Sequence, residues 1–83
     1  MTEIMIRDTI EKILFIYRDK LESSFYSKPN GELVELYLTI AYENKIFHKE
    51  FIESYKTKEE LDNAVKTLSD TFPTIIYKGD LVD

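Results

Sequence analysis

The stretch of sequence that decides the fold is ELVELYLTIAY, residues 32–42. Apolar residues alternate in it with a more polar set, at Val34, Leu36, Leu38, Ile40 and Tyr42. A period of two is typical of a strand with one buried face and one wet face. We therefore expect a half-buried strand over these residues.

The residues that follow this strand predict a hairpin. Asn tolerates the left-handed backbone, so Glu43-Asn44 can form a two-residue turn, with residues 45–54 as the returning strand. Directly opposed residues share a face of the sheet, so a loop of two or four residues sets Phe47 and Phe51 beside the buried side chains. A three-residue loop would instead place Ile46, His48, Glu50 and Ile52 there. The even loop gives the more apolar core.

The N-terminal part predicts a helix from Thr2 or Glu3 to about Phe25. Its main apolar stripe follows the i, i+3, i+4, i+7 spacing at Ile6, Ile10, Ile13, Leu14, Tyr17, Leu21 and Phe25. Phe15 and Ile16 lie off that stripe and about 100° apart, so burial of the stripe leaves them poorly covered. They are expected either to be covered within the chain or to contact another molecule.

Proline and glycine end this helix at residues 27–31, SKPNG. After the hairpin, Thr57 and Glu60 form a capping box that predicts a second helix, which continues to about Thr71. The β-branched run at residues 74–78 then predicts a third strand. We expect an α+β fold in the order α-β-β-α-β, with a three-stranded, mainly antiparallel sheet and two helices packed on one of its faces.

Length and composition indicate one compact domain over residues 1–83, since a chain of this size has one core. There is no cysteine, which excludes disulfides and thiolate metal sites. No apolar run approaches a membrane span and no signal-peptide pattern opens the chain, so a cytoplasmic location is expected. The preference for Ile, Lys, Glu, Asn and Tyr is typical of a low-GC host or of its phages and plasmids.

The sequence contains no pattern of a known catalytic or cofactor site, and two glycines are too few for a phosphate-binding loop. His48 is the only histidine, and with Glu50 it supplies two of the three or more ligands that a metal needs. We therefore expect no cofactor, no metal and no enzymatic activity. A His48–Glu50 acid/base pair, on one sheet face with Glu35 and Tyr37, remains the least favoured alternative.

The chain is acidic, with a net charge of −5, which opposes direct binding of nucleic acid. Most of this charge falls between residues 32 and 62, which hold eight acidic and four basic residues. Glu59 and Glu60 are explained by the start of the second helix. Four carboxylates of the hairpin have no such local role, and Tyr37 lies among them in the sequence. The candidate surface therefore consists of Glu35, Tyr37, Glu43, Glu50 and Glu53.

These five residues are either a solvated sheet face or a surface for a basic protein partner. The leading functional hypothesis is a small, acidic, non-enzymatic protein-binding module, of the kind by which a phage- or plasmid-type inhibitor or an immunity-like protein occludes a basic surface. The alternative is a structural or regulatory homo-oligomer that assembles through Phe15 and Ile16 on the first helix.

Overall fold

The computed structural model describes residues 2–17 and 21–82 of the 83-residue chain. Its elements run in the order α1 (Glu3–Ile16), β1 (Glu22–Asn30), β2 (Leu33–Tyr42), β3 (Lys45–Tyr55), α2 (Lys58–Thr71) and β4 (Ile76–Asp80). The α+β class is confirmed. The expectation of three strands is wrong, because four strands form the sheet.

The additional strand is β1, which occupies sequence that the apolar stripe assigned to the first helix. Leu21 precedes this strand and Phe25 lies within it, while α1 ends at Ile16 and residues 18–20 lie outside the described residues. Ser23 and Ser24 are weak helix formers, because a serine hydroxyl can hydrogen-bond to nearby backbone groups in non-helical conformations. The i, i+4 spacing of Tyr17, Leu21 and Phe25 is therefore coincidental.

The sheet has the strand order β3-β2-β1-β4. β1, β2 and β3 form an antiparallel meander, and β4 pairs with β1 in the parallel direction. Pro29 lies in β1 beyond its last pair with β4, where β1 pairs with β2 alone among the described strands. A local edge of this kind is where a strand tolerates proline.

Two-residue turns join the strands of the meander. Gly31, with φ of 63°, and Glu32 connect Asn30 to Leu33, which pair directly. Glu43 and Asn44 both have positive φ, 49° and 68°, as a type I′ hairpin turn requires. The predicted β2–β3 turn is thus confirmed, together with its even length.

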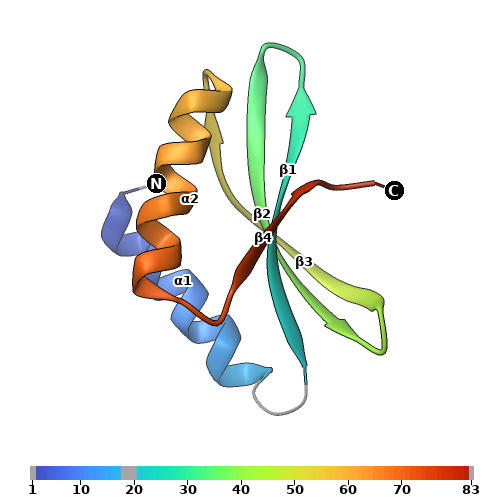
Figure 1. Ribbon diagram of the computed structural model, residues 1–83. Helices are drawn as coiled ribbons and strands as arrows, with labels where there is room; N and C mark the ends of the chain where they lie inside the picture. The colour runs from blue at the N-terminus through green and yellow to red at the C-terminus, as the bar shows by residue number, and fades with distance from the viewer. Residues whose placement is uncertain (1, 18–20, 83) are drawn as a thin grey trace.

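Both helices lie on one side of the sheet, as Figure 1 shows, and neither covers the other face. The core fills the space between helices and sheet. It is formed by the buried side chains Ile6, Ile10, Ile13, Phe25, Leu36, Leu38, Ile40, Ile52, Leu61, Val65, Leu68, Phe72 and Ile75. We call the uncovered side the open face of the sheet.

Each helix begins with a threonine cap. The Oγ1 atom of Thr2 accepts from the Met5 amide at 3.2 Å, and that of Thr57 accepts from the Glu60 amide at 3.1 Å. The Glu60 carboxylate reaches back to the Lys56 amide at 3.2 Å. The capping box predicted from Thr57 and Glu60 therefore starts α2 as expected.

Two β-bulges interrupt the β2–β3 ladder. Ala41 pairs with Ile46 and Ile40 with His48, so Phe47 is an extra residue. Tyr37 pairs with Phe51 and Leu36 with Glu53, so Ile52 is a second one. Each extra residue reverses the alternation of side chains along the strand.

The bulges contradict the predicted core of the hairpin. Phe51 points to the open face and is 39% exposed, and Phe47 is exposed beside the end of α1. Ile52, which strict alternation placed outside the core, is fully buried. The turn length was predicted correctly, but the bulges that change the register further along β3 were not.

Candidate functional site

The open face carries a row of three aromatic side chains at its centre. Tyr26 of β1 pairs with Tyr37 of β2, and Tyr37 pairs with Phe51 of β3. Directly paired residues share a face, so the three rings stand side by side across adjacent strands. We refer to Tyr26, Tyr37 and Phe51 as the aromatic row.

The rings of the aromatic row are held in a defined geometry. The centroids of Tyr37 and Phe51 are 5.8 Å apart with an interplanar angle of 72°, an edge-to-face contact. The Tyr37 hydroxyl donates to Oε1 of Glu35 at 3.0 Å, and Nδ2 of Asn30 donates to Oε2 of the same carboxylate at 3.2 Å. Glu35 therefore anchors the central ring of the row.

Two isoleucines extend the open face on one side of the aromatic row, the side on which Ser24 pairs with Thr39. Ile46 of β3 pairs with Ala41 near the end of β2, and Ile76 of β4 pairs with Ser24 and is 63% exposed. Between them lie two buried residues, Ser24 and Thr39, where the Thr39 hydroxyl donates to the Ser24 carbonyl oxygen at 3.3 Å. Two small, buried side chains thus lie beside the aromatic row, flanked by the two isoleucines.

The charges on the open face nearly balance. The register places Lys28 and Lys49 there together with Glu35, and Lys78 lies 3.9 Å from the Glu22 carboxylate. In a chain of net charge −5, most of the acidic excess therefore lies elsewhere.

A second surface lies where α1 borders β3, the edge strand on that side of the sheet. A groove of about 360 Å³ separates the two elements, and its lining includes Asp8, Lys12 and Ile16 of α1 and His48 and Glu50 of β3. We call it the α1–β3 groove. His48 Nε2 lies 3.2 Å from Glu50 Oε1, and the ring of Tyr17 contacts those of Phe47 and His48 at 5.5 and 5.3 Å.

The structure divides the five predicted partner-binding residues between surfaces. Glu35 and Tyr37 lie on the open face, and Glu43 lies in the β2–β3 turn. Glu50 lines the α1–β3 groove, and Glu53 lines a different pocket between α1, α2 and β3. The sequence placed His48 and Glu50 on one face with Glu35 and Tyr37, which is wrong because the bulge at Phe47 moves them to the side of the helices.

Both predicted oligomer-contact residues are exposed: Phe15 by 70% and Ile16 by 61%. Ile16 lies in the same groove as Glu50, so one residue from each predicted set shares a surface. Burial against the rest of the described residues, 2–17 and 21–82, therefore does not account for these two side chains.

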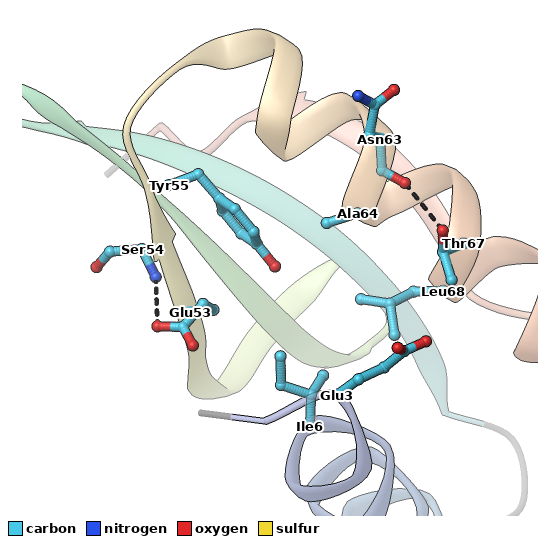
Figure 2. Close-up of a pocket in the computed structure, with 9 residues that line it drawn as sticks. All are labelled: Glu3, Ile6, Glu53, Ser54, Tyr55, Asn63, Ala64, Thr67 and Leu68. Carbon is cyan, nitrogen blue, oxygen red and sulfur yellow. Dashed lines mark hydrogen bonds between the residues drawn. The ribbon is translucent and has the colours of Figure 1, made fainter.

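The pocket that contains Glu53 has a volume of about 440 Å³, and Figure 2 shows its lining. Ile6, Ala64 and Leu68 form apolar walls, and the Tyr55 ring projects between β3 and α2. Burial raises the pKa of the Tyr55 hydroxyl above its ordinary value, and the nearby Glu53 carboxylate adds to the rise. The pocket therefore favours a neutral phenol.

No cluster of three or more metal-ligating side chains occurs among residues 2–17 and 21–82. His48 and Glu50 form a pair without a third ligand in that part of the chain. Within the same ranges, no helix is long and apolar enough to cross a membrane.

Sequence reasoning missed Tyr26 and Phe51 as surface residues. Asn30-Gly31 carried the signal for Tyr26, since this dipeptide before a strand is a hairpin signature and implies a preceding strand. Phe51 had no such signal, because its orientation depends on the bulges.

Comparisons with protein-family models, with curated proteins and with solved structures gave no match to this chain.

Proposed function

We propose that this chain is a non-enzymatic protein-binding module and that its main contact surface is the open face of the sheet. The observation that carries the proposal is the aromatic row of Tyr26, Tyr37 and Phe51, in register across three adjacent strands with no helix over it. The proposal keeps the protein-binding function inferred from the sequence, but it moves the contact surface from the acidic residues of the hairpin to the open face.

A merely solvated face would carry different side chains. Antiparallel sheets with one wet face place polar residues on it, so that strands alternate apolar and polar. Here the centre of the face is aromatic, with Ile46 and Ile76 beyond the row. Aromatic side chains bury much area at a low entropic cost, and they dominate the energy of many protein interfaces.

The position of Glu35 favours a protein over a single-stranded nucleic acid. Stacking sites for bases combine rings with a positive groove, whereas the hydroxyl of Tyr37 donates to a carboxylate. The net charge of −5 also repels phosphates. A partner with basic groups around an apolar centre complements both Glu35 and the chain as a whole.

Electrostatics would act mainly on the rate of association. Because the charges on the open face nearly balance, attraction to a basic partner comes from the net charge of the chain, including Glu43 in the turn beside β2. Such steering raises association rates and falls with salt. In an inhibitor- or immunity-like protein that occludes a basic surface, the aromatic row would provide the affinity and the net negative charge would raise the association rate.

The test is a quantitative affinity capture from a low-GC bacterial lysate with wild type, Tyr37→Ser, Phe51→Ser and the control Tyr42→Ser. Tyr42 is an exposed tyrosine at the end of β2, outside the aromatic row. The proposal expects a basic protein that wild type and the control retain and that both row variants lose by at least about tenfold, as for hot-spot residues. A captured protein that the row variants retain in full, or no captured protein, overturns it.

A further inference from the structure

The side of α1 that borders β3 has an unusual distribution of exposed side chains. Met5, Thr9, Lys12 and Ile16 recur at intervals of three or four residues, so at 100° per residue they share one side of the helix. That side lies about a right angle from the buried Ile6, Ile10 and Ile13. We call these four residues the lateral stripe.

The lateral stripe is apolar at both ends and charged between them. Met5 is 54% exposed and Ile16 is 61% exposed, while Lys12 and the neighbouring Asp8 lie in the middle. In an antiparallel pair of identical helices centred near residue 10, Met5 meets Ile16 of the second copy and Asp8 meets Lys12. The stripe is therefore complementary to itself, as a two-fold interface requires.

The edge strand β3 is complementary to itself about Lys49. In an antiparallel pair centred on that residue, His48 faces Glu50 of the second copy, and Lys45 faces Glu53. His48 and Glu50 both lie on the helix side of the sheet, since they pair with the buried Ile40 and Leu38. Opposite charges across a strand pair stabilise it, and the repulsion between the two copies of Lys49 opposes it.

The centres of the two patterns lie side by side in the chain. The α1–β3 groove is lined by Asp8, Thr9 and Lys12 from the middle of α1 and by His48 and Glu50, which flank Lys49. One two-fold axis perpendicular to the sheet can therefore relate both helices and both strands. The self-complementary patterns of α1 and of β3 are therefore both consistent with this one axis.

We propose that a second copy of this chain docks here, with α1 antiparallel to α1 and β3 antiparallel to β3. Ile16 and Met5 would lose their exposure in this dimer, and β3, an outer strand of the sheet, would gain a neighbouring strand. A standard interface buries about 800 Å² per partner, about one seventh of the 5738 Å² surface of this chain. The dimer leaves the open face uncovered, so it does not depend on the proposed function.

The first test is sedimentation equilibrium of the wild type, Ile16→Glu and the control Ile76→Glu. Ile76 is as exposed as Ile16 but lies on β4, at the opposite edge of the sheet. We expect the wild type and the control to sediment as dimers of the 9.9 kDa chain, and Ile16→Glu to raise the dissociation constant at least about tenfold. A folded wild type that is monomeric at every concentration, or a dimer that only Ile76→Glu disrupts, overturns the proposal.

The second test is a charge exchange between Lys45 and Glu53. They lie eight residues apart on β3, roughly 26 Å at the rise of a strand, which exceeds the screening length of about 8 Å at physiological salt. Within one chain, the charges of Lys45 and Glu53 therefore do not interact appreciably. Lys45→Glu and Glu53→Lys should each weaken the dimer, and the double variant should restore it; a double variant weaker than both overturns the register. Circular dichroism confirms that each variant is folded.

Discussion

The sharpest test of the structure compares the removal of two adjacent side chains, Ile52 and Phe51. Ile52 is fully buried at the second bulge of β3, whereas Phe51 is 39% exposed on the open face. Ile52→Ala removes three carbons, worth about 2.4 kcal/mol at about 0.8 kcal/mol each, and leaves a cavity that adds to this loss. We expect a total loss of about 3 to 4 kcal/mol from the free energy of unfolding.

Phe51→Ala should cost much less. It loses the edge-to-face contact with Tyr37, worth about 0.5 to 1.5 kcal/mol, and only part of its area is removed from water in the folded chain. Urea denaturation followed by circular dichroism measures both variants. With a slope near 1 kcal/mol per molar, the midpoint should fall by roughly 3 M for Ile52→Ala and roughly 1 M for Phe51→Ala.

The strictly alternating register predicts the reverse order, with Phe51 in the core and Ile52 outside it. A greater loss for Phe51→Ala than for Ile52→Ala would therefore refute the bulged register and, with it, the position of Phe51 in the aromatic row. A variant with a changed urea slope would need comparison by thermal unfolding, because the slope reports the surface exposed on unfolding.

Two further predictions concern the residues at the start of α2: the Thr57 cap, and the titration of Tyr55 and Lys58. Thr57→Ala removes the side chain that accepts from the Glu60 amide, and it should lower the free energy of unfolding by about 1 kcal/mol in the same urea assay, whereas Thr57→Ser should not. At high pH, the chain should lose stability for two reasons that act in the same direction. The pKa of Lys58 is raised mainly by its hydrogen bond to the Tyr77 hydroxyl at 2.6 Å, and burial raises that of Tyr55. A group with a raised folded pKa contributes fully below its unfolded pKa and loses that contribution as the pH rises through the folded value, so stability should fall above about pH 10. Urea unfolding between pH 8 and pH 11 measures the fall, and Tyr55→Phe should reduce it; equal slopes in both proteins would contradict the role of Tyr55.

The sequence predicted those elements whose signals are local. The alternation over residues 32–42 identified β2, the Glu43-Asn44 pair identified the hairpin turn, and Thr57 with Glu60 identified the start of α2. Each of these signals depends on residues within a few positions of one another. Elements with local signals can be predicted from the sequence because their conformation does not depend on contacts with distant residues.

β1 could not be recognised by its pattern, because its core side is mostly small and polar. Ser23, Phe25 and Ser27 face the helices in this strand, and only Phe25 is large and apolar. Ser27 is buried because it belongs to a chain of hydrogen bonds, in which its hydroxyl lies 2.8 Å from the Tyr77 hydroxyl and 3.2 Å from Oδ1 of Asp80. Its partners lie about fifty residues away, so the local sequence gives no reason to bury it.

The division of the candidate site between two surfaces has one physical cause, the bulge at Phe47 in β3. Without it, Phe51 would face the helices, and His48 and Glu50 would stand beside Tyr37 on the open face. The bulge exchanges these positions, so that aromatic side chains gather on the face and charged ones line the edge. Bulges occur often at sheet edges and near functional sites, where they re-aim side chains.

The same exchange makes the two proposals compatible. A two-fold axis perpendicular to the sheet keeps both open faces on one side, so a dimer through α1 and β3 presents two aromatic rows in the same direction. If both rows contact one partner assembly, the second contact becomes intramolecular, and the overall affinity exceeds that of either row without any new contact. A partner that is itself two-fold symmetric or repetitive would therefore be bound more tightly by the wild type than by Ile16→Glu, although that substitution leaves the open face unchanged.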